Sequence, residues 1–290
     1  MEVLMTHMGP NTRPPRSRYA FCRGYEIHVT EWGDPAHETV VMWHGLARTG
    51  RDFDTLARSL ADTYHIIAPD TLGRGLSAWS KHPDDEYCLG FYAAIATDLL
   101  DHFDLHRVRW VGTSMGGALG IRLAGGLFRD RISHLVINDI APQLAAPAIE
   151  RILAYAGAPP QFDTVTELEQ FLRTAYRPYG WLSDAEWRSM AETSARRTDG
   201  GRVTVHYDPK MVRQFVCHPT DYDQWPLYDA ITARTLLLRG KESDLILPEW
   251  AQEMGRRGPQ AQVVEIDGVG HAPALNVPDQ ISLIRGFLAA

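Results

Sequence analysis

The stretch at residues 109–117 constrains the fold of this chain more than any other. An apolar run leads into Gly-Thr-Ser-Met-Gly at residues 112–116, and a helical segment rich in small residues follows to about Phe128. Glycines two residues on either side of Ser114 let neighbouring backbone approach closely, as a tight turn between a strand and a helix requires. We therefore predict a strand that ends in a sharp turn and is followed at once by a helix.

Short apolar runs and amphipathic helical stretches alternate on both sides of this turn. After an expected hairpin (19–21 with 25–29), buried strands are predicted at residues 39–43, 64–69, 135–140, 235–240 and 262–266, and helices at 53–60, 92–103, 248–256 and 278–288. Regular alternation of strand and helix indicates right-handed crossovers between parallel strands. The predicted fold class is α/β, with a doubly wound and mostly parallel sheet.

The alternation stops at Pro142 and resumes at about Thr235. Between them the sequence shows no strong buried strand, but amphipathic helices are expected at 149–155, 166–176 and 184–194, among several Trp and Tyr residues. A segment of roughly 90 residues is longer than a connecting loop should be. We predict that residues 1–140 and 235–290 form the α/β core and that residues 141–234 form an inserted helical cap.

Composition narrows the range of partners. The chain of 290 residues has a net charge of -7, which provides no basic surface for nucleic acid or for an anionic membrane. A small molecule is the expected partner. Three cysteines, few and odd in number, favour neither a disulfide framework nor a zinc site, so a reducing, cytoplasmic setting is expected. Residues 1–17 lack the apolar core of a signal peptide and are expected to form a loose arm, and no stretch is long and apolar enough to span a bilayer.

Ser114 is the candidate nucleophile. A serine hydroxyl needs a base that takes its proton and a third group that orients the base. Of twelve histidines, His271 is the candidate base, because it lies in a glycine-flanked loop just after the last predicted strand. For the orienting acid, the loop after 235–240 offers Glu242 and Asp244, and we predict Asp244 because its shorter side chain lies further past the strand. Asp139, at the end of the preceding strand, is the alternative; otherwise it caps the following turn.

Other polar residues do not form a metal or cofactor site in this interpretation. His102 and His106 are four residues apart but lack the carboxylate of a metalloprotease motif, so they are assigned to a solvated helix face. No cofactor and no metal are predicted.

Four motifs in order resemble those of the α/β-hydrolase superfamily, and the resemblance extends from Tyr19 onward. They are the strand, turn and helix around Ser114, the His44-Gly45 turn, the D-x-x-G-x-G-x-S pattern at 70–77, and the chain order of nucleophile, acid and histidine. The resemblance implies an oxyanion hole formed by the backbone N–H groups of Leu46 and Met115. It also implies that aromatic side chains of the cap close over a substrate.

Within that superfamily the chain is most similar to bacterial capped carboxylesterases. This similarity implies that a small-molecule ester is cleaved through an acyl-enzyme. Residues 138–142 and 268–273 also resemble hydrolases of short 3-hydroxyalkanoate oligomers. Acyl-chain length, stereoselectivity and oligomeric state stay open.

Several other activities share this fold. Haloalkane dehalogenases and epoxide hydrolases need a carboxylate nucleophile, which Ser114 is not. C–C bond hydrolases, lactonases and cofactor-free haloperoxidases keep the serine and stay open, because a fold does not determine a substrate. In a C–C hydrolase, Arg173, Arg177 or Arg188 could bind an acidic arm of the substrate; otherwise they are solvated. A binding protein without catalytic activity is the alternative from another class.

Overall fold

A computed structural model describes residues 14–290. The loose arm predicted for residues 1–17 lies mostly outside these described residues. Its last two residues, Arg16 and Ser17, belong to a strand, so the prediction is wrong for them.

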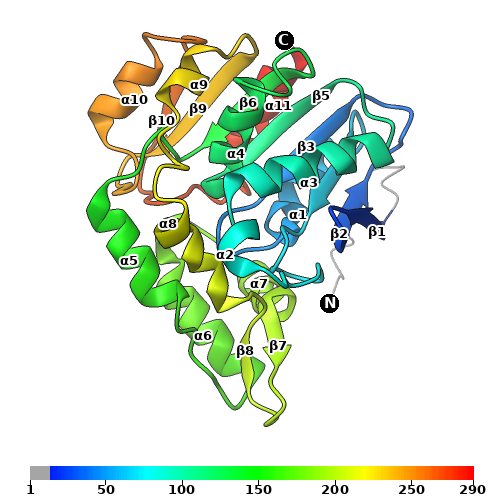
Figure 1. The fold of residues 1–290 in the computed structure, drawn as a ribbon, viewed down its shortest axis with the longest axis vertical. Coiled ribbons are helices and arrows are strands. Elements are labelled where there is room, and N and C mark those ends of the chain that lie inside the picture. The colour runs from blue at the N-terminus through cyan, green and yellow to red at the C-terminus, as the bar shows by residue number, and fades with distance from the viewer. Residues whose placement is uncertain (1–13) are drawn as a thin grey trace, which may run out of the picture.

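A mixed sheet of eight strands forms the centre of the molecule, in the order β1-β2-β4-β3-β5-β6-β9-β10 (Figure 1). Only the pairs β1–β2 and β2–β4 are antiparallel. The strands are β1 (Arg16–Cys22), β2 (Tyr25–Trp32), β3 (Thr39–Trp43), β4 (His65–Pro69), β5 (Val108–Thr113), β6 (Ile132–Asn138), β9 (Arg234–Gly240) and β10 (Gln262–Ile266). The predicted α/β class with a mostly parallel sheet is confirmed.

Helices cover both faces of this sheet because its central strands are apolar on both sides. All five residues of β3 are buried, as expected of a parallel strand between two layers. Trp43 packs in one hydrophobic cluster with α3 and α4, and Met42 packs in a second cluster with α1 and α11. The helices of this part of the chain are α1 (Asp54–Leu60), α2 (Pro83–Glu86), α3 (Leu89–His102), α4 (Met115–Ala124), α10 (Pro248–Met254) and α11 (Pro278–Ala289).

The segment between β6 and β9 adds no strand to the central sheet. It contains α5 (Ala146–Ala156), α6 (Val165–Ala175), α7 (Asp184–Ser194), α8 (Gln214–Cys217) and α9 (Trp225–Asp229). Figure 1 shows α5, α6 and a small hairpin at one end of the molecule, beyond the strands of the sheet. The three predicted helices are present. The division into a core and a cap stays a prediction.

The small hairpin was not expected. Its strands, β7 (Ala195–Arg197) and β8 (Val203–Val205), have three residues each and pair in antiparallel fashion. Three residues are too few for an alternating pattern to be recognised. The start of α7 is better defined, since Ser183 and Glu186 form a capping box.

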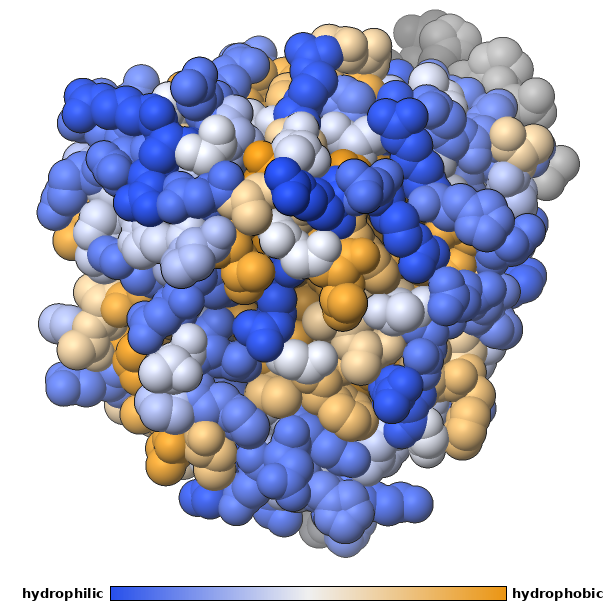
Figure 2. Space-filling view, turned by 45° about the horizontal axis from the view of Figure 1, so that its top comes forward, coloured by the Kyte–Doolittle hydropathy of each residue, from blue (hydrophilic) through white to orange (hydrophobic). Residues whose placement is uncertain are grey.

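The surface is mainly hydrophilic in the view of Figure 2, with hydrophobic side chains interspersed, as in ordinary globular proteins. Within residues 14–290, no helix combines the length and apolar character needed to cross a bilayer.

Candidate active site

Ser114 lies between β5 and α4 in a backbone conformation that few residues adopt. Its φ is 50° and its ψ is -114°. The glycines around it are needed for steric reasons: a Cβ atom on Gly116 would collide with the carbonyl oxygen of Trp43, and one on Gly112 would collide with the carbonyl oxygen of Gly116. Strain of this kind persists only where the surrounding structure enforces it. The predicted strand, sharp turn and helix are all present.

His271 links Ser114 to a buried carboxylate. Its Nε2 atom lies 3.0 Å from Ser114 Oγ, and its Nδ1 atom lies 2.6 Å from Asp139 Oδ2. The side chain of His271 is 21% exposed, whereas that of Asp139 is fully buried. An Nδ1–H that donates to the carboxylate leaves Nε2 free to accept the serine proton. His271 is therefore placed to take the proton of Ser114, while Asp139 orients the imidazole.

The structure corrects the predicted acid: Asp139, and not Asp244, contacts His271. Asp244 has a side chain that is 58% exposed, and it pairs with Arg151 of α5. Asp139 follows the last residue of β6, and β6 is the immediate neighbour of β5 in the sheet. Because both strands are parallel, their carboxyl ends place Asp139 beside the turn that holds Ser114.

The loop after β9 contributes hydrogen-bond donors instead of the acid. The N–H of Gly240 donates to Asp139 Oδ1 at 2.7 Å, and the Ser243 hydroxyl donates to Asp139 Oδ2 at 2.6 Å. Chain order could not separate the two aspartates, since both lie between Ser114 and His271. The sequence did hold one usable signal: Asp139 directly follows the strand that comes after the serine strand in sequence.

The two N–H groups predicted for an oxyanion hole lie beside Ser114. Met115 is the first residue of α4, so its N–H has no acceptor within the helix. Leu46 follows Gly45, where a Cβ atom would lie 3.7 Å from the Cβ of Ser114. Within residues 14–290, neither N–H donates to a protein acceptor. Both are therefore available to an oxygen that gains negative charge next to Ser114.

His44 has a positioning contact that the sequence analysis did not anticipate. Its Nδ1 atom donates to the carbonyl oxygen of Gly45 at 2.7 Å, and its Nε2 atom accepts the N–H of Thr71 at 2.9 Å. Burial lowers the pKa of His44 to about 4, so the ring is neutral at pH 7. In a trans peptide the C=O and the following N–H point in opposite directions. Holding the carbonyl of Gly45 therefore fixes the direction of the Leu46 N–H.

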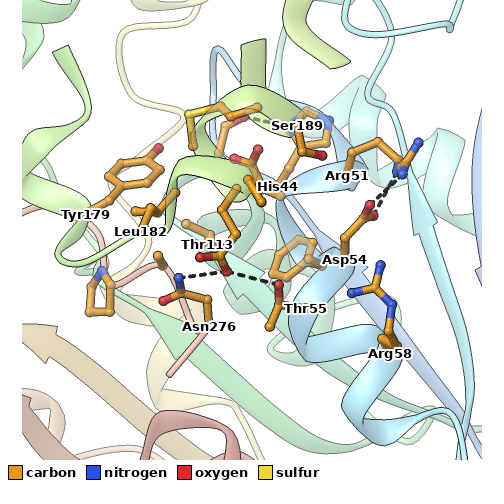
Figure 3. Close-up of a pocket in the computed structure, with 18 residues that line it drawn as sticks. His44, Arg51, Asp54, Thr55, Arg58, Thr113, Tyr179, Leu182, Ser189 and Asn276 are labelled. Carbon is orange, nitrogen blue, oxygen red and sulfur yellow. Dashed lines mark hydrogen bonds and ion pairs between the residues drawn. The ribbon is translucent and has the colours of Figure 1, made fainter. Parts of the chain in front are cut away.

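A cavity of about 270 Å³ opens beside this group (Figure 3). Gly45, Thr113 and Pro273 line it and adjoin Ser114 and His271 in sequence or in space, but Ser114 and His271 are not themselves among the lining residues. Residues of α1 and α7 form its walls, and Tyr179 and Leu182 line it from the loop before α7. Such cavities, mostly apolar with a few polar groups, are typical of sites for small ligands.

The three arginines that the C–C hydrolase alternative would use to bind an acidic substrate arm lie away from the cavity. Arg173 and Arg188 both pair with Glu169 of α6, and neither they nor Arg177 line the cavity. The cavity instead contains Arg51, which pairs with Asp54, and Arg58. Arg58 is exposed and has no acidic partner within 4 Å among the residues that the structure describes, and Figure 3 shows it at the edge of the lining residues.

The carboxylate of Glu186 links two walls of the cavity. Glu186 of α7 accepts hydrogen bonds from Asn276 at 3.0 Å and from Thr55 of α1 at 3.2 Å, as Figure 3 shows. Burial raises the pKa of Glu186, but hydrogen bonds from Ser183 and Asn276 outweigh this effect and lower it overall. Glu186 is therefore an ionised group that connects α7 to α1 across the cavity.

Comparisons with known proteins agree with this fold. The model of a family described as "Alpha/beta hydrolase family" matches residues 40–282. A 3-hydroxybutyrate-oligomer hydrolase of Cupriavidus necator is 38% identical over 267 residues, which are 89% of this chain and 90% of that protein. The esterase YbfF of Escherichia coli is 27% identical, over 86% of this chain and 92% of its own.

Solved structures show the same architecture over nearly the whole chain. An alpha/beta hydrolase from Novosphingobium aromaticivorans superposes with a TM-score of 0.85 and 31% sequence identity, covering 95% of this chain and 98% of that one. Together with the match to the family model over most of the sequence, this similarity shows that the chain belongs to the alpha/beta hydrolase family.

Proposed function

We propose that this protein is a serine hydrolase that cleaves carboxylic esters of small molecules through an acyl-enzyme. The observation that carries the proposal is the continuous hydrogen-bonded path from Ser114 through His271 to Asp139, with distances of 3.0 Å and 2.6 Å. The named activities of the relatives, a hydroxybutyrate-oligomer hydrolase and an esterase, support ester bonds as the class of bond that is cleaved.

The proposed reaction has two halves. His271 takes the proton of Ser114 as its Oγ atom attacks the ester carbonyl carbon, and the charged oxygen accepts the N–H groups of Leu46 and Met115. The alcohol leaves with the proton from His271. Water then gives a proton to the same histidine and attacks the acyl-enzyme, which releases the acid and restores Ser114. Asp139 stabilises the imidazolium throughout.

For the substrate, we propose short oligomers of 3-hydroxy acids. The relative that is 38% identical is named for 3-hydroxybutyrate oligomers. A linear oligomer of this kind carries a free carboxylate at one end. Arg58 is a cation of the cavity wall with no acidic partner among the described residues, so it is suited to attract that carboxylate.

A panel of substrates tests both parts of this proposal. We expect the wild type to hydrolyse p-nitrophenyl acetate and butyrate and a 3-hydroxybutyrate dimer, and Ser114→Ala to lose on the order of 10⁴-fold or more in kcat. A Ser114→Ala protein that keeps its turnover would contradict the nucleophile. Cleavage of a dienoic ring-fission product or a lactone in place of esters would assign one of the other serine-based activities. Absence of any turnover would favour a binding protein.

Arg58→Gln tests the carboxylate contact. We expect KM for the 3-hydroxybutyrate dimer to rise about threefold to tenfold, the scale of a partly exposed ion pair, with no change for the uncharged p-nitrophenyl acetate. Arg129→Gln is the matched control, because Arg129 is also exposed but does not line the cavity. Equal changes for both substrates would show that Arg58 does not recognise the carboxylate.

A further inference from the structure

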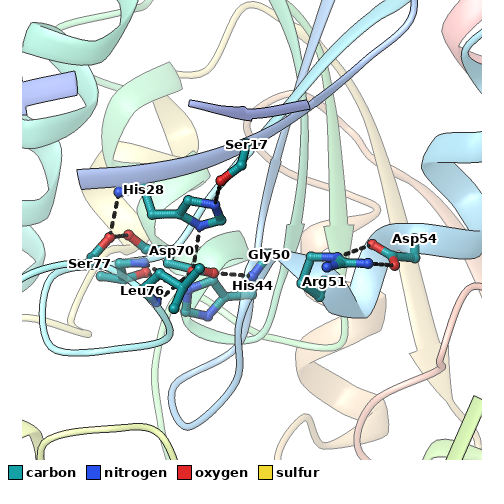
Figure 4. A network of polar contacts seen from close by, with 10 residues as sticks. Ser17, His28, His44, Gly50, Arg51, Asp54, Asp70, Leu76 and Ser77 are labelled. Atoms are coloured by element: carbon teal, nitrogen blue, oxygen red, sulfur yellow. Dashed lines mark hydrogen bonds and ion pairs between the residues drawn. The ribbon is translucent and has the colours of Figure 1, made fainter. Parts of the chain in front are cut away.

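A second hydrogen-bonded series of serine, histidine and aspartate lies among the strands at the β1 edge of the sheet. Ser17 of β1 has its Oγ atom 2.7 Å from His28 Nε2, and His28 Nδ1 lies 2.8 Å from Asp70 Oδ2 (Figure 4). His28 belongs to β2, and Asp70 directly follows β4. These contacts have the same atoms in the same order as those of Ser114, His271 and Asp139. We call the three residues Ser17, His28 and Asp70 the strand set.

The hydrogen bonds of the strand set run in the direction that activates a serine: the serine hydroxyl donates to the histidine, and the histidine donates to the aspartate. Burial raises the pKa of Asp70, but the hydrogen bond from His28 and the neighbouring imidazoles outweigh it and lower that pKa overall. An ionised Asp70 accepts a hydrogen bond, so the proton of His28 is held on Nδ1. The Nε2 atom then accepts the hydroxyl proton of Ser17. Ser17 itself is exposed, whereas His28 and Asp70 are buried.

The strand set borders a cavity of its own, with a volume of about 300 Å³. Ser17, His28 and Asp70 all line it, together with Arg51, Thr49 and His206. Thr49 is only 3% exposed, and its buried hydroxyl oxygen has no hydrogen-bond partner among the described residues. The cavity therefore gives a small molecule access to the base-linked hydroxyl of Ser17.

We propose that Ser17 is a second nucleophile, which takes an acyl group from an activated carboxylic ester bound in this cavity. Ser17 Oγ forms a bond to the carbonyl carbon, and the bond to the leaving oxygen breaks. The hydroxyl proton passes to His28 Nε2 and from there to the leaving group. This inference does not depend on the proposed function, because none of these residues belongs to the set around Ser114.

The acyl group on Ser17 is expected to persist. Ser17 lies within a strand, where it pairs with Thr30 of β2, and no helix begins at the following residue. The site therefore lacks the free N–H at a helix start that Met115 provides beside Ser114. Both acylation and deacylation form an oxyanion. The serine alkoxide is a far poorer leaving group than p-nitrophenolate, so attack of water on the ester of Ser17 is much slower than acylation by an activated ester. Ser17 is thus a site of stable acylation and not a site of turnover.

The test uses the full-length Ser114→Ala protein and p-nitrophenyl acetate. We expect one equivalent of p-nitrophenolate to be released without continued turnover, and mass spectrometry of peptides to place the acetyl group on Ser17. The double variant Ser114→Ala, Ser17→Ala should show neither. Continued turnover in Ser114→Ala would contradict the proposed function, whereas the location of the acetyl group decides this inference separately.

Ser133 is an internal control in the same protein. Its hydroxyl also contacts a histidine, His134 Nδ1 at 3.1 Å, but no carboxylate orients that ring. We expect Ser17 to be acetylated on the order of 10²-fold faster than Ser133, the scale of general-base catalysis. His28→Asn should remove this advantage. His28→Asn changes a buried residue and can affect folding. The comparison of Ser17 with Ser133 within one folded protein therefore tests the inference without that variant. Equal acetylation of the two serines, or acetyl groups on lysines alone, overturns the inference.

Discussion

Two groups in this molecule contain the same three residue types: Ser114, His271 and Asp139 form one, and the strand set is the other. The backbone conformation around the serine differs between them. In the first, the contacts measure 3.0 Å and 2.6 Å, and in the second they measure 2.7 Å and 2.8 Å. Ser114 has a φ of 50° and precedes the first residue of a helix, whereas Ser17 pairs in an ordinary antiparallel ladder. Side-chain geometry alone does not distinguish the two serines.

This difference shows what a strained turn adds to a triad. Beside Ser114, the N–H groups of Leu46 and Met115 have no protein acceptor within residues 14–290, and the proposed mechanism assigns an oxyanion to them. Ser17 instead lies in the extended backbone of an edge strand that pairs with β2, with no helix start beside it. We infer that turnover depends on the backbone around a serine as much as on its histidine and aspartate.

The largest expected effect comes from Asp139. Asp139→Asn should lower kcat for p-nitrophenyl butyrate by about 10⁴-fold, because an amide cannot hold the imidazole in the required tautomer. Asp244→Asn is the matched control and should change kcat less than about threefold, because Asp244 is exposed and pairs only with Arg151. The reverse ranking in steady-state assays would show that the orienting acid acts from the loop after β9.

The effect of intermediate size is a loss of folding stability in acid, caused by His44 in the loop beside Ser114. The folded protein holds the pKa of His44 at about 4, below its ordinary value of 6.5. Between these values the unfolded chain binds a proton that the folded chain does not, so stability is full above pH 6.5 and decreases as the pH falls toward 4. The loss from His44 amounts to about 3 kcal/mol.

Urea unfolding at several pH values between 7 and 4 checks this loss. Burial also lowers the pKa of His65 and of His206, which contribute in the same direction. The diagnostic quantity is therefore the difference from His44→Gln, a variant that cannot titrate at this position and should show a smaller loss of stability on acidification. Parallel curves for the two proteins would mean that His44 is not held neutral.

The smallest expected effect is that of Ser17→Ala in the wild-type background. Steady-state hydrolysis of p-nitrophenyl butyrate should stay within about twofold of the wild type, because Ser17 lacks the donors needed for turnover. Stability should change by no more than about 1 kcal/mol, the usual contribution of one partly exposed hydrogen bond. A large loss of kcat would mean that the strand set supports the active site through Asp70, whose Oδ1 atom accepts the N–H of Gly50 at 2.8 Å.

Local patterns predicted most of the fold correctly. The apolar run at 39–43 matches β3, because a strand buried on both faces has a sequence that few other structures accommodate. The strand predicted at 262–266 matches β10, which is an edge strand and is only partly buried. The helix expected to reach Phe128 ends at Ala124, followed by Gly125 and Gly126, which is an ordinary uncertainty of a helix end. The β7–β8 hairpin was missed because its strands are too short to show a period.

The candidate site residues also divide into those that the sequence indicates and those that only the tertiary structure brings together. The sequence by itself determined Ser114 and His271, because glycines mark the turns that carry them and a close backbone approach excludes larger residues. Only the tertiary structure decided between Asp139 and Asp244, since both precede His271 and differ only in the strand that carries them. The same is true of Ser17, His28 and Asp70, which come from separate strands and meet only when β1, β2 and β4 are paired. Sheet order is a property of the whole chain, so no local pattern could reveal these contacts.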